Sequence, residues 1–142
     1  AIRRRLGHDW GRAWSYFNLG CVAFDQGDYG AARGLLRDSL ALSDADANQD
    51  RLLNLLDLFA ALDAVEGRAS RAAYLAGAAS ALRDSIGIRH VSIDRGRLDR
   101  ALAPARQEIG EEFFAVAWAA GHELSLRQAV AFALDEHAEP PR

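Results

Sequence analysis

Apolar residues recur along most of this 142-residue chain at intervals of three and four, the spacing of one face of an α-helix. Apolar and polar residues nowhere alternate as in a half-buried strand, and two of the three prolines stand at the C-terminal end. We therefore predict an all-α fold without strands, in which each apolar series forms one buried stripe. The clearest series are Trp10-Trp14-Phe17-Cys21-Phe24, Ala32-Leu35-Leu36-Leu40, Leu52-Leu55-Leu56-Phe59-Leu62 and Ala72-Leu75-Ala76-Ala79-Leu82. We expect helices at about 9–26, 29–44, 49–66, 69–86, 94–109, 111–120 and 126–137.

Glycine and serine mark the expected helix ends. Five glycines stand where a residue without a Cβ can adopt the left-handed conformation that ends a helix, namely Gly27, Gly67, Gly87, Gly110 and Gly121. Ser125 and Gln128 form a capping-box pattern before the last helix. Pro104 falls inside the fifth helix, where it would cost about 3 kcal/mol, so we expect a kink or a break at Ala103. The longest connection, at about 87–93, separates four N-terminal helices from three C-terminal ones.

An internal repeat appears when Gly27 is aligned with Gly67, because two predicted helical hairpins then match at an offset of 40 residues. In this alignment small residues of one copy match small residues of the other, as Gly20 matches Ala60 and Ala32 matches Ala72. The two helices of a hairpin approach closely only where side chains lack bulk, and one hairpin cannot bury both of its faces alone. The repeat therefore predicts hairpins that stack.

The first hairpin resembles a tetratricopeptide repeat through Tyr16-x2-Leu19-Gly20-x2-Ala23, Gly27-Asp28-Tyr29-x2-Ala32 and Leu36-x2-Ser39-Leu40. The second copy keeps Gly67, Ala72 and Ala79 but lacks the Leu-Gly pair and the aromatic residue after the turn. Its offset exceeds the usual repeat of about 34 residues, which places the surplus in the polar stretch 44–50. The resemblance implies an α-α superhelix with repeats at about 13–46 and 53–86. A three-helix cap at about 93–137 would follow, its core closed by Phe113, Phe114, Trp118 and Leu126.

A wider resemblance covers residues 6–42, 66–87 and 109–136, which in this order are similar to the C-terminal tetratricopeptide-like region of LuxR-type and related ATP-binding bacterial transcriptional regulators. Its most telling part is Phe113-Phe114-x3-Trp118-x2-Gly121-x2-Leu124-Ser125-Leu126-x2-Ala129-Val130. In that family the ATPase and the DNA-binding domain lie elsewhere in the polypeptide, and the repeat region senses a partner or small effector and controls self-association. The resemblance implies a cytoplasmic, non-enzymatic interaction and sensing module. Because the chain starts at Ala1 without methionine, we expect a piece of a longer protein. The resemblance does not fix the identity of the upstream domains, since similar regions also follow kinase or cyclase domains.

Composition and charge exclude several other classes. All 17 basic residues are arginine, so the phosphate-binding loop of an ATPase, which needs a lysine, is absent from this sequence. The single Cys21 cannot form an internal disulfide, and neither a signal peptide nor a membrane span is recognisable. Arginines at 3, 4, 5 and 12 and at 95, 97, 100 and 106 could meet phosphates, but acidic residues interrupt the second group and the net charge is −3. We expect no direct nucleic-acid contact and no membrane contact.

Candidates for catalysis are few. Cys21, His8, His90, His122 and His137 show neither a nucleophile-base pattern nor a metal-ligand spacing. Cys21 falls on an apolar stripe, where a buried thiol is ordinary, and the pair Glu111-Glu112 is explained by the helix N-terminus that follows Gly110. We therefore predict no enzymatic activity, no cofactor and no metal.

Binding by the repeat is the remaining hypothesis. In stacked hairpins the first helix of each pair lines the concave surface, so we predict lining by Trp14, Phe17, Cys21, Phe24 and Asp25 in the first copy, and by Asn54, Asp57, Ala61, Ala64 and Val65 in the second. The occupant would be a protein partner or the protein's own upstream domains, with self-association through the Trp10/Trp14 surface as one form. Alternatively, a small-molecule effector binds an aromatic pocket near Trp14, Phe17 and Phe24, or a preceding repeat of the intact protein simply packs on these aromatics.

Overall fold

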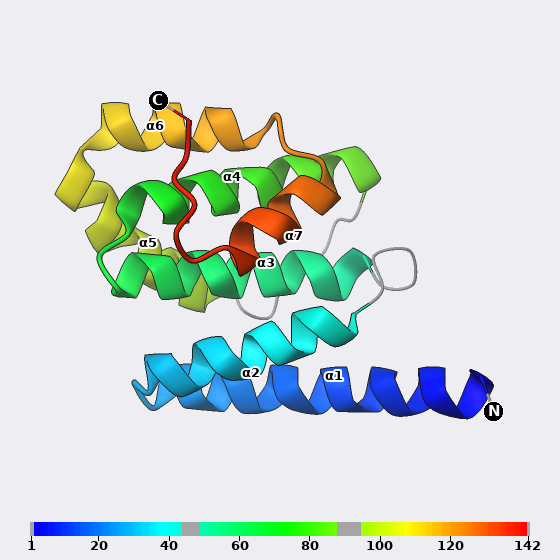
Figure 1. Cartoon of the computed structure of the whole chain (residues 1–142). Coiled ribbons are helices and arrows are strands. Elements are labelled where there is room, and N and C mark those ends of the chain that lie inside the picture. Colours follow the sequence, from blue (N-terminus) through cyan, green and yellow to red (C-terminus); the bar gives the residue numbers. More distant parts are fainter. Residues whose placement is uncertain (1, 44–48, 88–94, 142) are drawn as a thin grey trace. The chain divides into compact units, whose positions relative to one another are not determined.

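The computed structural model describes residues 2–43, 49–87 and 95–141, and this part of the chain contains helices and no strand (Figure 1). The all-α prediction is confirmed. The helices are α1 (Ile2–Asp25), α2 (Tyr29–Leu42), α3 (Gln49–Val65), α4 (Ala69–Ile86), α5 (Arg95–Ile109), α6 (Glu111–Gly121) and α7 (Leu126–Leu134).

Most predicted helix limits agree with the structure to within three residues, and the exceptions have physical reasons. The first helix begins at Ile2, because nothing in Arg3-Arg4-Arg5-Leu6 opposes helix formation. The fifth helix continues through Pro104, so of the kink or break expected at Ala103 the break is wrong. A proline leaves one carbonyl of the preceding turn without its helical partner, and α5 tolerates that loss. The polar stretch 44–50 and the connection 87–93 lie mostly outside the described residues.

The chain divides into two compact units, residues 1–55 and 56–142, with the boundary inside α3. In the first unit α1 packs along α2, and the contact depends on small residues. A Cβ at Gly20 would lie 2.7 Å from a methyl carbon of Leu36, so a larger residue there would displace the buried Leu36 side chain. Nearby, the buried Ser39 hydroxyl donates to the Ala13 carbonyl oxygen at 2.6 Å. The predicted close contact at Gly20 in the first hairpin is confirmed.

The turns after α1 and α3 share one geometry at the predicted offset of 40 residues. The Asp28 N–H donates to the Ala23 carbonyl at 2.9 Å, and the Arg68 N–H donates to the Asp63 carbonyl at 2.7 Å. Gly27 and Gly67 have φ of +80° and +82°, the left-handed conformation that this helix-ending motif requires. The alignment of Gly27 with Gly67 therefore corresponds to a repeated local structure.

In the second unit α4 is the central helix, and α5, α6 and α7 all pack against it (Figure 1). The closest approach is between α4 and α6. A Cβ at Gly77 of α4 would lie 2.2 Å from the Trp118 carbonyl oxygen, and a Cβ at Gly121 of α6 would lie 2.1 Å from the Tyr74 carbonyl oxygen. Gly121 is the last residue of α6 and has no positive φ, so its expected left-handed conformation is wrong. Glycine is needed there because a helix backbone passes against it.

The single buried stripe expected of each helix is too narrow for α3 and α4. From Arg71 to Ala79 every residue of α4 is buried, and α3 is nearly as enclosed. A helix that is covered on all sides needs small or apolar residues all round, and α4 meets this need with alanine and glycine.

The four residues predicted to close the core of the C-terminal three-helix cap differ in burial. Phe114 is buried, Trp118 and Leu126 are half-buried, but Phe113 is 72% exposed. The expectation that Phe113 closes the core is wrong, because two adjacent residues of a helix point about 100° apart and only one of them can face α4.

The capping box predicted at α7 is present. The Gln128 N–H donates to the Ser125 hydroxyl at 3.1 Å, and the Gln128 side-chain oxygen accepts from the Ser125 N–H at 2.9 Å. Replacing Ser125 with alanine should lower the free energy of unfolding by about 1 kcal/mol, whereas glycine should cost only a few tenths of that. Urea denaturation followed by circular dichroism measures both values. Equal losses for the two variants would contradict a role for the side-chain cap.

Candidate functional site

The predicted lining residues of α1 have very different exposures. The Trp14 ring is 47% exposed and stacks on Phe17, with ring centroids 5.7 Å apart. The guanidinium of Arg51 lies 5.5 Å from the centroid of the Trp14 ring, a cation–π arrangement. Burial lowers the pKa of Arg51, which nevertheless stays protonated at any physiological pH.

The other aromatic rings of this predicted surface are buried. Phe17 and Phe24 are each 8% exposed, and Phe24 packs against Tyr29 with ring centroids 5.3 Å apart. Cys21 is half-buried with a free thiol, and Asp25 is exposed. Of the predicted aromatic residues, Trp14 is therefore the one that offers a large apolar surface to a ligand.

On α3 the predicted lining residues are mostly enclosed. Asn54 is half-buried, while Asp57 is 3% exposed and its carboxylate pairs with the Arg83 guanidinium of α4. Ala61 and Ala64 are buried, and Val65 is 37% exposed. Since a buried carboxylate is stable only when paired, Asp57 has a structural explanation of its own.

A surface that the sequence reasoning did not select lies on α1 itself. Leu19 and Val22 are 53% and 51% exposed, and residues three apart share one face of a helix. In the sequence both look like ordinary members of a helical pattern, and Leu19 belongs to the Leu-Gly pair of the repeat motif. Their exposure shows that this apolar face of α1 is available for contact.

The second unit contains a groove beside α6, bounded by the chain segment that follows α7. This segment runs back across α4 toward α6 (Figure 1), and the groove has a volume of about 730 Å³. Its walls are mostly apolar, with the Ser70 hydroxyl and the Glu139 carboxylate as polar groups. The lining residues are Ser70, Phe113, Val116, Ala117, Glu139, Pro140 and Pro141.

Arg71 of α4 holds this C-terminal segment in place. Its Nη1 donates to the carbonyls of Asp135 and Ala138, both at 2.7 Å, and its Nη2 donates to the carbonyl of Phe132 at 3.1 Å. The guanidinium also lies 4.3 Å from the centroid of the Phe132 ring. A cation beside these carbonyls is also favourable because the C-terminal end of a helix carries partial negative charge.

The charge of Arg71 is balanced by Asp63 of α3, whose carboxylate accepts from Nε at 3.1 Å. Both side chains are almost fully buried, at 3% and 0% exposure. Sequence reasoning missed this pair, although a signal exists: Asp63 and Arg71 stand four residues before and four after Gly67, inside otherwise apolar stretches. A hairpin turn at Gly67 brings such positions together.

Neighbouring contacts extend the same anchor. Arg68 donates to the Glu136 carbonyl at 2.6 Å, and the Tyr74 ring packs edge-on against Phe132 at 4.8 Å between centroids. Burial raises the pKa of the Tyr74 hydroxyl, which therefore stays neutral. The wall of the groove formed by residues 135–141 is thus attached to α4 at several points.

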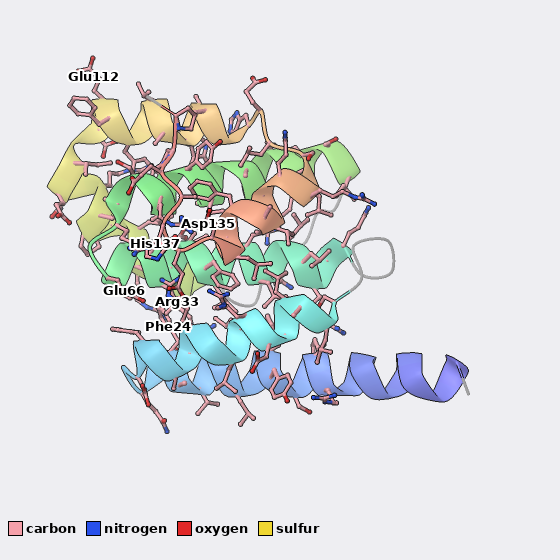
Figure 2. The ribbon with its side chains drawn as sticks, viewed as in Figure 1. Phe24, Arg33, Glu66, Glu112, Asp135 and His137 are labelled. Carbon is pink, nitrogen blue, oxygen red and sulfur yellow. The ribbon has the colours of Figure 1, made fainter. Side chains whose placement is uncertain are left out.

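The two histidines whose side chains the structure describes, His122 and His137, contact other groups. The His122 ring lies edge-on to Trp118 at 6.3 Å, and the His137 N–H donates to the Asp135 carboxylate at 3.1 Å (Figure 2). The side chain of His8 and the whole of His90 lie outside what the structure describes. Within the described part of the chain, no three His, Cys, Asp or Glu residues are grouped so that they could hold a metal ion.

Comparison with known proteins adds no functional assignment. No family model, no curated protein and no solved structure matches the chain. In the described residues no helix combines the length and apolar character needed to cross a membrane.

Proposed function

We propose that this chain is a non-enzymatic protein-interaction module built from helical hairpins of the tetratricopeptide type. The observation that carries the proposal is the apolar face of α1 on which Leu19 and Val22 expose about half of their surface. Large apolar side chains that share a helix face in water are typical of a contact surface for another protein. The resemblance of the sequence to regulator C-terminal regions supports a bacterial transcriptional regulator as the setting.

A protein partner fits α1 better than a small effector does. A small-molecule site needs an enclosed cavity, whereas the rings of Phe17 and Phe24 are buried within the protein and Trp14, Leu19 and Val22 project from a convex helix. The helix can therefore offer an outer face to another helix, but it does not surround a ligand.

Site-specific photocrosslinking tests the proposal. With a benzophenone amino acid at position 19 of the intact protein in its host, we expect a discrete protein adduct on irradiation. The same probe at the exposed Asp38 of α2 should give none. Adding Val22→Glu to the position-19 probe should reduce the adduct about tenfold, because a charge would then have to be buried in the contact. Absence of an adduct at position 19, or an adduct that Val22→Glu leaves unchanged, would contradict the proposal.

A further inference from the structure

The two ends of the chain carry opposite charge. The first twelve residues contain four arginines and one aspartate, a net charge of +3. Residues 108–142 contain seven acidic residues and two arginines, a net charge of −5, within a chain whose total is −3. The acidic end includes the groove beside α6, so the groove and the beginning of α1 are electrostatically complementary.

The groove has an apolar floor and one carboxylate in its lining, and a second carboxylate lies beside it on α6. Phe113 and Val116 of α6 are 72% and 60% exposed, and Glu112 stands one helical turn before Val116 on the same face. Figure 2 shows Glu112 at the outer side of the N-terminal end of α6. The carboxylate in the lining is that of Glu139.

These two carboxylates are available for a partner. The adjacent Glu111 pairs with Arg106 at 3.4 Å, but no basic side chain in the described part of the chain forms an ion pair with Glu112 or Glu139. An occupant of this groove should therefore present apolar side chains together with positive charge.

We propose that the groove beside α6 receives the basic N-terminal half of α1 from a second copy of this chain. That stretch supplies both the positive charge and the apolar side chains that would complement the groove. Its arginines are Arg3, Arg4, Arg5 and Arg12, and its large apolar residues are Leu6, Trp10 and Trp14. Arg12 and Trp14 are exposed on α1. The contact is head-to-tail, since the two surfaces differ, and it can continue from copy to copy.

A helix fits this groove better than a small molecule does. A volume of about 730 Å³ is within the range of ligand pockets, but such pockets enclose most of their ligand. Here the lining residue Phe113 is itself largely exposed, so the groove is open to solvent at α6. An elongated partner can cover Phe113 and Val116 while its arginines reach Glu112 and Glu139. The inference rests on the proposed interaction function but uses a different surface from Leu19 and Val22.

Sedimentation velocity of the full chain, at protein concentrations on the order of 100 µM, tests the proposal. We expect association at low ionic strength and its loss at about 1 M salt, where the Debye length falls to about 3 Å. Charge reversal of the groove, Glu112→Arg with Glu139→Arg, should weaken association at least tenfold. Charge reversal at the start of α1, Arg3→Glu with Arg4→Glu and Arg5→Glu, should also weaken association at least tenfold. Acidic residues near the N-terminus of a helix do not disfavour its formation.

Mixing the two reversed variants provides the decisive comparison. Each alone should sediment as a monomer, whereas the mixture should associate because every basic helix then finds an acidic groove and every acidic helix a basic one. Reversal of two exposed acids elsewhere, Asp38→Arg with Asp84→Arg, changes the net charge as much as the groove reversal and should leave association intact. A native chain that is monomeric at low salt, a mixture that stays monomeric, or a control that weakens association equally would overturn the inference. None of these results affects the adduct at position 19, which tests the proposed function separately.

Discussion

Replacing Arg71 with alanine should lower the free energy of unfolding by about 3–5 kcal/mol, among the largest effects of any single substitution in this chain. The change leaves the Asp63 carboxylate fully buried without its cation. It also removes the guanidinium hydrogen bonds to the carbonyls of Phe132, Asp135 and Ala138 at the end of α7 and just after it. An unpaired buried charge costs far more than the net contribution of an ordinary hydrogen bond. Urea denaturation followed by circular dichroism measures the loss.

Arg106 offers a matched control for this substitution. Like Arg71 it pairs with a carboxylate and lies over a phenylalanine ring, at 4.4 Å from the Phe114 centroid, but its side chain is 49% exposed. Arg106→Ala should cost about 1 kcal/mol or less, because water solvates both exposed charges when the pair is broken. The double variant Asp63→Leu/Arg71→Met should recover part of the loss, since no charge is left buried. Similar costs for Arg71→Ala and Arg106→Ala would show that burial of the pair does not determine its energy.

Replacing Gly121 with alanine should destabilise the protein by about 3 kcal/mol or more, although alanine is the better helix former. The new Cβ would lie 2.1 Å from the Tyr74 carbonyl oxygen and 2.9 Å from the Ala78 nitrogen, both of them backbone atoms of α4. No change of rotamer can relieve that overlap, so α4 and α6 would have to separate. Gly77→Ala should have a similar effect, because its Cβ would meet the Trp118 carbonyl oxygen.

Gly34→Ala is the matched control for the glycine substitutions. Gly34 lies inside α2, and a Cβ there would meet no atom within 4 Å. With no clash, the higher helix propensity of alanine should raise the free energy of unfolding by up to about 1 kcal/mol. Thermal denaturation of the three variants gives the comparison. A stabilised Gly121→Ala variant would show that α4 and α6 do not approach as described.

The local structure of this protein could be predicted from its sequence to a large extent. Helix limits follow from apolar spacing and from residues with strong conformational preferences, and Gly27, Gly67 and Ser125 each act within a few residues of their own position. That Gly20 lies where the two helices of the first hairpin approach was foreseeable from the repeat, whereas its contact with Leu36 was not.

The candidate sites were predicted less well. Trp14 was named among the lining residues of α1, but the exposed Leu19 and Val22 were not, since apolar spacing does not tell which apolar residues stay uncovered. The groove beside α6 could not be anticipated at all. It depends on residues 135–141 returning across α4, and no local pattern in that acidic, proline-containing segment indicates where it packs.

The sequence alone thus determined the helices, most of their ends and the repeated hairpin turn, because these depend on interactions between residues close together in the chain. Only the tertiary structure decided that Phe113 faces water while Phe114 is buried, that Gly121 serves close packing, and that Arg71 joins Asp63 to the end of α7. Each of these outcomes depends on which helix passes against the residue. That choice reflects the packing of the whole unit, in which many alternative pairings of apolar faces satisfy the same local pattern.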